Sequence, residues 1–115
     1  MAGRPRIRLL IGDIVALGPG KARLLEAVGQ TGSIAAAARA MDMSYRRAWL
    51  LVDAMNNDFV EPLVERSTGG RGGGGAGLTA LGVDVLDRYR RIEAIAAAAA
   101  DEELTAFSAL LKERT

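Results

Sequence analysis

Apolar residues recur at helical spacing near the start of the chain and predict its first helix. The stripe consists of Leu24, Leu25 and Val28. It indicates a helix over about residues 19–30, and Pro19 suits the first turn because its fixed φ matches helical backbone. Glycine commonly ends a helix, so we expect this one to end near Gly29 or Gly32.

Two further helices are predicted, separated by a brief turn at residues 42–43. Ser33 suits the N-cap of an alanine-rich helix over residues 34–41, and Ser44 suits the N-cap of a helix over residues 45–56. The expected buried stripe of the second helix is Ala48, Leu51, Val52 and Met55. Two helices joined by so tight a turn form a helix-turn-helix pattern.

Strands are predicted on both sides of these helices. Residues 6–11 partly alternate between polar and apolar and indicate a short N-terminal strand. Pro62 blocks further helix. Residues 63–66 and 76–79 then predict the two strands of a hairpin whose tip is the glycine-rich segment 67–75.

A long final helix is predicted from Ala80, with Thr79 as its N-cap. Its apolar stripe is Leu81, Val85, Tyr89, Ile92 and Ala96, widened by Leu86 and Ile95. Asp101 suits the cap of a renewed helical segment with Leu104, Phe107, Leu110 and Leu111 on one face. The expected fold class is therefore mainly α with a small β-hairpin, a winged helix-turn-helix with a long C-terminal helix.

Composition narrows the function chiefly through what is missing. The 115 residues include no Cys and no His, which removes thiolate and imidazole metal ligands, cysteine nucleophiles and histidine bases. The remaining carboxylates, lysines and hydroxyls form no recognisable catalytic constellation, so we expect no enzyme activity, no cofactor and no metal. No apolar run approaches the length of a membrane span, and no apolar segment long enough for a signal peptide follows the basic start. We therefore expect a cytoplasmic protein.

The start of the third helix carries the candidate chemistry. Helices that enter the major groove contact base edges with their N-terminal residues, and Tyr45, Arg46 and Arg47 occupy that first turn. Arginine forks onto guanine O6 and N7 or onto a phosphate. Two arginines at a helix N-terminus oppose the helix dipole, a cost that a negatively charged partner would offset. The alternative is a solvated helix end with two ordinary surface arginines. A net charge of +1 leaves DNA binding open, because placement matters more than the sum.

Three further residues of this region have two interpretations each. Ser33 and Ser44 suit donation to phosphate, although capping alone explains both. Trp49 lies one turn after Tyr45, where contact with DNA competes with a role in the core or an interface, and we favour the latter.

The glycine-rich hairpin tip is the second candidate site. Six glycines surround Arg71 between residues 69 and 75, and the Lys-Ser/Thr ending of a Walker A loop is missing. As a wing, the loop would lay Thr68 and Arg71 along the DNA backbone or the minor groove. The alternative is a mobile linker.

The last helix suggests self-association. Its apolar stripe exceeds what so small a domain needs, and a seam between two copies is the natural use, because paired domains contact paired half-sites. The alternative is a helix that folds back onto its own domain. We therefore expect a winged helix-turn-helix domain over residues 1–79 and one or more dimerisation helices over residues 80–115.

Several segments together form a specific pattern. They are Gly32-Ser33-Ile34 with Ala36-Ala37-Ala38, Met43-Ser44-Tyr45-Arg46-Arg47-Ala48-Trp49, Leu63-Val64-Glu65, and Thr68-Gly69-Gly70-Arg71-Gly72-Gly73-Gly74-Gly75-Ala76 with Leu78-Thr79. Over roughly residues 6–95 the chain resembles the N-terminal DNA-binding domain of the molybdate-responsive ModE regulators and, more distantly, the winged domains of LysR-type regulators. The resemblance implies a homodimeric transcriptional regulator of molybdenum-related genes that binds a palindromic double-stranded operator.

One departure from the ModE pattern limits this expectation. Full-length regulators of that family carry C-terminal oxyanion-binding domains, whereas this sequence stops at Thr115 after a helix. We therefore expect no molybdate pocket of that kind in these residues, which argues against direct molybdate binding. Two other functions stay open at this point: a winged-helix module for protein interaction, and an anion-sensing module that binds at arginine clusters.

Overall fold

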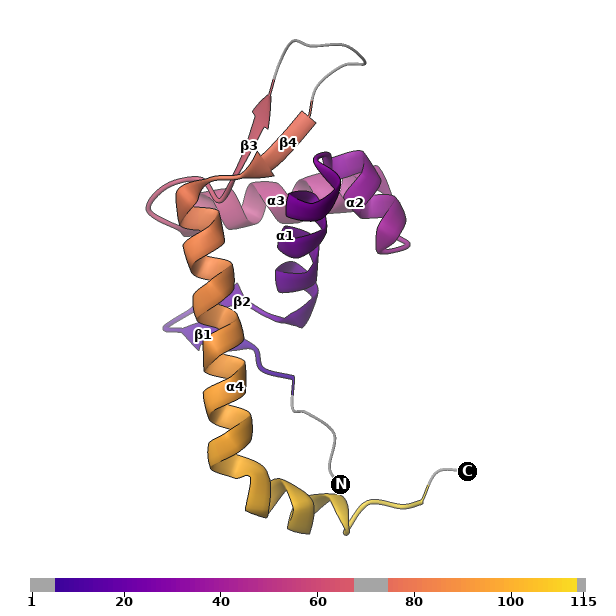
Figure 1. Ribbon diagram of the computed structural model, residues 1–115, viewed down its shortest axis with the longest axis vertical. Coiled ribbons are helices and arrows are strands. Elements are labelled where there is room, and N and C mark those ends of the chain that lie inside the picture. The colour runs from indigo at the N-terminus through magenta and orange to yellow at the C-terminus, as the bar shows by residue number, and fades with distance from the viewer. Residues whose placement is uncertain (1–5, 68–74, 114–115) are drawn as a thin grey trace.

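The computed structural model describes residues 6–67 and 75–113, which form a compact head and one long helix that projects from it (Figure 1). The molecule measures 54 × 34 × 22 Å along its principal axes. Its elements are β1 (Leu9–Ile11), β2 (Ile14–Leu17), α1 (Pro19–Thr31), α2 (Ile34–Ala40), α3 (Tyr45–Asp58), β3 (Val64–Ser67), β4 (Gly75–Leu78) and α4 (Ala80–Ser108).

The core lies where α1, α2 and α3 pack together against the base of the β3–β4 hairpin. The largest fully buried side chains are Tyr89, Leu17, Leu24, Leu25, Met55, Leu63 and Val28. Both predicted stripes are confirmed in α1 and α3, except that Leu51 is only partly buried at the edge of the core. Small residues on α2 let it approach its neighbours closely, and Ala37 and Ala38 are buried.

Three of the four predicted N-caps are present, those at Ser33, Ser44 and Thr79. The Ser33 Oγ accepts a hydrogen bond from the Ala36 N–H at 2.9 Å, and the Ser44 Oγ accepts one from the Arg47 N–H at 3.1 Å. Thr79 Oγ1 accepts the Gly82 N–H at 2.9 Å. Each cap satisfies a backbone donor that has no partner inside its helix, which is why sequence alone located these boundaries. Gly32, with φ of 80°, ends α1 as the C-cap.

The N-terminal strand differs from the prediction over residues 6–11. β1 is only Leu9–Ile11, and it pairs antiparallel with a second strand, β2, that the sequence pattern did not indicate. Gly12 adopts φ of 62° in the tight turn between them. A backbone with positive φ favours glycine, so the Gly12-Asp13 pair that breaks the apolar run is a hairpin turn.

The last helix corrects a second prediction. Asp101 does not cap a renewed segment, because α4 continues unbroken through it to Ser108. The alanine run before Asp101 has high helix propensity and contains no breaker, so nothing there stops the helix. No helix within residues 6–67 and 75–113 has the length and apolar character needed to cross a bilayer.

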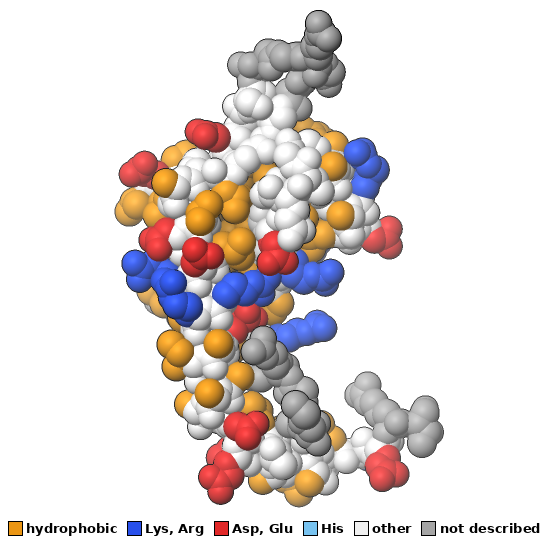
Figure 2. Space-filling view, viewed as in Figure 1, with side chains coloured by type: hydrophobic (Ala, Val, Ile, Leu, Met, Phe, Trp, Pro, Cys, Tyr) orange, Lys and Arg blue, Asp and Glu red, His pale blue; other side chains and the backbone are white. Residues whose placement is uncertain are grey.

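Only the first half of α4 packs on the head. Tyr89 is buried, and Leu81, Val85 and Leu86 pack partly against the core. The Tyr89 hydroxyl donates to the Ile7 carbonyl. Burial, with the Glu93 carboxylate nearby, raises the pKa of the Tyr89 phenol, so the hydroxyl keeps the proton that it donates. Beyond Tyr89 the expected stripe is open to solvent: Ile92 and Ile95 are exposed, and hydrophobic side chains show along α4 in Figure 2.

A close backbone approach at Leu63 fixes the root of α4. The Leu63 carbonyl accepts the Thr79 N–H at 2.9 Å, and Thr79 Oγ1 donates to the Pro62 carbonyl at 2.8 Å. Gly82 lies directly against this peptide: a Cβ at position 82 would lie 2.1 Å from the Leu63 oxygen. Only glycine allows α4 to start at this distance from the wing.

We expect Gly82→Ala to lower the free energy of unfolding by roughly 2–3 kcal/mol, because the added methyl must push two backbone segments apart. Urea denaturation followed by circular dichroism measures this. Gly20→Ala is the matched control, since a Cβ at Gly20 in α1 meets nothing within 4 Å. It should be neutral or stabilise by up to about 1 kcal/mol. Equal effects at the two glycines would contradict the close approach.

Candidate nucleic-acid interface

A tight turn sets the angle between α2 and α3. The Met43 N–H donates to the Ala38 carbonyl at 2.9 Å, and the Asp42 N–H donates to the Arg39 carbonyl at 3.2 Å. Asp42 itself has φ of 55°, a left-handed conformation that Asp tolerates better than most residues. The predicted turn at residues 42–43 is confirmed, and α3 starts directly after it, at Tyr45.

The first turn of α3 is presented to solvent. Tyr45 is 46% exposed, and Arg46 and Arg47 are exposed as well. Neither arginine forms an ion pair with any residue in the described ranges. The Ser44 Oγ uses a lone pair in the cap, so its hydroxyl hydrogen stays available to a phosphate oxygen. Four of the predicted site residues, Ser44 to Arg47, therefore lie together at one exposed helix end.

Ser33 lies apart from that group, at the start of α2. It is half-buried, and its Oγ caps the helix as expected. The other two predicted site residues, Thr68 and Arg71, lie outside the described residues. The strands that lead to them are in place: β3 pairs with β4 from Val64↔Leu78 to Ser67↔Gly75. The Ala76 N–H donates to the Gly32 carbonyl at 2.8 Å, which fastens β4 to the end of α1.

A hydrogen bond joins β3 of the wing to α3. Arg66 Nη2, on β3, donates to the Tyr45 hydroxyl at 3.2 Å. The sequence predicts a strand at Arg66 and no functional role for it. No local signal distinguishes it, because its importance comes from the fold bringing residue 66 beside residue 45. The pair adds a third cation to the surface formed by Arg46 and Arg47.

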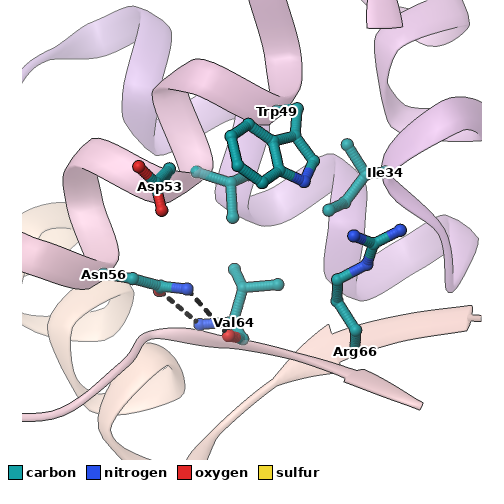
Figure 3. Close-up of a pocket in the computed structure, with 7 residues that line it drawn as sticks. Ile34, Trp49, Asp53, Asn56, Val64 and Arg66 are labelled. Atoms are coloured by element: carbon teal, nitrogen blue, oxygen red, sulfur yellow. Dashed lines mark hydrogen bonds between the residues drawn. The ribbon is translucent and has the colours of Figure 1, made fainter. Parts of the chain in front are cut away.

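Trp49 does not lie in the core, which corrects one part of the favoured interpretation; its alternative part, a role in an interface, stays a prediction. It is 37% exposed and borders a cavity of about 140 Å³ between α3 and the wing. Figure 3 shows its ring on one side of this cavity, with Ile34 and Arg66 on the other. The core side of α3 is already occupied by Ala48, Val52 and Met55, which leaves the indole at the surface.

Asn56 holds the base of the wing against α3. Its Oδ1 accepts the Leu63 N–H at 2.8 Å and the Val64 N–H at 3.0 Å, and its Nδ2 donates to the Val64 carbonyl at 3.1 Å (Figure 3). One amide side chain thus satisfies three backbone groups at the start of β3. Nothing in the sequence distinguishes Asn56 from its neighbour Asn57, so this role could not be predicted from the sequence.

These features define the class of protein. A helix pair joined by a tight turn, with arginines exposed at the start of the second helix and a two-stranded wing beside it, is a winged helix-turn-helix DNA-binding domain. Residues 20–83 match the family model described as bacterial regulatory helix-turn-helix protein, lysR family. The chain belongs to this family.

Known proteins agree with this assignment. The chain is 47% identical over 78 residues to both the molybdenum-pterin-binding protein MopB of Rhodobacter capsulatus and the molybdenum transport protein ModE of Azotobacter vinelandii, matching 68% of this chain and 29% of each relative. It is 41% identical over 71 residues to the DNA-binding transcriptional dual regulator ModE of Escherichia coli K12, matching 62% of this chain and 27% of that protein. The chain thus spans less than a third of the length of these relatives.

A solved structure extends the comparison to the fold. The DNA-binding domain of CbnR, crystallised in complex with DNA, superposes with a TM-score of 0.59 at 30% sequence identity. The match covers 76% of this chain and 94% of that chain. The predicted fold class and the predicted resemblance to ModE and LysR-type regulators are both confirmed, and the chain is a helix-turn-helix DNA-binding protein similar to the ModE regulators.

We expect Asn56→Ala to destabilise the protein by roughly 2–3 kcal/mol, because it leaves two buried N–H groups of the wing without their acceptor. Asn57→Ala, at the exposed neighbouring position, should change stability by less than about 0.5 kcal/mol. Urea denaturation of both variants makes the comparison. A loss of the same size in Asn57→Ala would contradict the anchoring role of Asn56.

Proposed function

We propose that this chain is a sequence-specific transcriptional regulator that places the start of α3 in the major groove of double-stranded DNA. The observation that carries the proposal is the pair Arg46 and Arg47, exposed at the N-terminus of α3 with no ion-pair partner among the described residues. Two cations at the positive end of a helix dipole are unfavourable alone, and a guanine edge or phosphate offsets the cost.

The remaining predicted residues fit backbone contacts around this point. Ser33 and Ser44 each have a hydroxyl hydrogen to donate to a phosphate, and Thr68 and Arg71 would follow the DNA from the wing. Such contacts fix orientation, whereas Tyr45, Arg46 and Arg47 would supply the base contacts. Arg66 would contact a phosphate as well, because its hydrogen bond to Tyr45 holds it beside the start of α3.

We further propose that two copies pair through α4 and bind a palindromic operator. In this arrangement residues 1–79 bind DNA and residues 80–115 dimerise. The support is the apolar surface of α4 beyond the head, where Ile92 is 39% and Ile95 68% exposed. A helix of 29 residues that buries only Gly82 and Tyr89 in its own domain has a face left for a second copy.

The regulated genes are proposed from the relatives. Because the similar proteins are named for molybdenum transport, molybdenum-pterin binding and transcription, we propose molybdenum-related genes as the targets. The chain would act where bacterial DNA lies, in the cytoplasm. Direct binding of molybdate is assigned to none of the described residues, and no catalytic role is proposed.

Replacing Arg46 and Arg47 together with alanine should abolish specific binding, because each guanidinium contact with a base is worth roughly a 5- to 150-fold difference in affinity. Fluorescence anisotropy on a site selected from random DNA measures the loss. Arg88→Ala removes one arginine from α4, where Arg88 pairs with Asp84 at 3.0 Å, and should leave affinity nearly unchanged. Undiminished binding by the double variant would contradict the assignment of Arg46 and Arg47 to DNA contacts.

Ile95→Glu should convert the dimer to a monomer, because it places a charge in the proposed seam. Light scattering after size exclusion measures the mass, and affinity for a two-half-site operator should fall about tenfold or more. Ala94→Glu is the control: residue 94 is exposed and points about 100° away around the helix. A protein that is monomeric before substitution, or dimeric after Ile95→Glu, would contradict the proposed seam.

A further inference from the structure

The outward face of α3 is apolar immediately after its arginines. Trp49 is 37% and Leu50 49% exposed, and Tyr45 lies one turn before Trp49. These three side chains and Arg46 line one shallow surface hollow, and Leu50 also lines a second with Ser44, Arg46 and Arg47. Arg46 and Leu50 are common to both hollows, so they occupy the middle of the exposed face.

The packing of the domain does not explain this surface. Ala48, Val52 and Met55 turn the other side of α3 to the core, and Leu51 is partly buried at its edge. Single exposed apolar residues are ordinary, but a contiguous group on the helix that faces a ligand marks a contact surface. A polar residue at position 50 would leave the isolated domain at least as stable.

Charge argues against a second copy of this chain as the occupant of this face. Arg46 and Arg47 border the apolar group on the same helix end, and Arg66 lies beside Tyr45. A second copy seated face to face would bring these cations together, which is unfavourable. DNA offers the opposite charge around its grooves. The apolar group therefore faces the partner that the cations attract.

We propose that Leu50, with Trp49 beside it, contacts the C5 methyl groups of thymines next to the bases that Arg46 contacts. This inference rests on the proposed function. The thymine methyl is the apolar group that base pairs display in the major groove. Residue 50 lies one helical turn, about 6 Å, from residue 46, and successive base pairs are about 3.4 Å apart, so the methyl contact falls within about two base pairs.

The test replaces single thymines with deoxyuridine, which removes only the methyl group, in a site that the protein selects from random DNA. For the unmodified protein, one or two positions in each half-site should weaken binding about fourfold, the value of burying one methyl-sized group. Leu50→Ala should bind the unmodified site more weakly and lose its sensitivity at those positions. Leu50→Met, which keeps an apolar side chain of similar size, should retain it.

Val60→Ala is the control for loss of an exposed aliphatic side chain, because Val60 is 90% exposed after the end of α3. It should show the full deoxyuridine effect. If deoxyuridine changes nothing for the unmodified protein, or if Leu50→Ala keeps the same sensitivity, the methyl contact is overturned while DNA binding stands. A protein that selects no DNA site overturns the proposed function, and this inference with it.

Discussion

The peptide at Leu63 is where the three functional elements of the molecule are joined. Its N–H donates to Asn56 of α3, and its carbonyl accepts the N–H of Thr79, the cap of α4. Gly82 allows the helix to lie against the same carbonyl without a side chain between them. Because Leu63 directly precedes β3, the first strand of the wing, α3, the wing and α4 are all anchored at this one residue.

This constraint matters because a dimeric DNA-binding protein must hold its recognition helices at a fixed spacing. In the proposed dimer, the angle at which α4 leaves the head would set that spacing. Two weaker contacts reinforce it: Tyr89 donates to the Ile7 carbonyl, and Arg90 lies 3.6 Å from Glu26 of α1. The ion pair is partly exposed and so contributes little, which leaves backbone contact and burial to fix the angle.

Prediction from the sequence succeeded where structure is local. Ser33, Ser44 and Thr79 cap helices through atoms three residues away, so their spacing alone located α2, α3 and α4. It failed where the fold brings distant segments together. Asn56 bonds to the start of the wing, and Gly82 lies against Leu63. The spacing of apolar residues along the chain gives no sign of either contact. The core position expected for Trp49 is wrong because three smaller residues already fill that side of α3, whereas the alternative role in an interface stays a prediction.

The proposed function requires that the first two turns of α3 contact DNA, and backbone amide shifts during a titration measure this contact. With a selected site added to 15N-labelled protein, the largest changes should fall on residues 44–50, with smaller ones at Arg66 and Ser67. The amides of the second half of α4, from Ile92 onward, should move little. Changes confined to α4 or to the β1–β2 hairpin, with residues 44–50 unmoved, would contradict the claim.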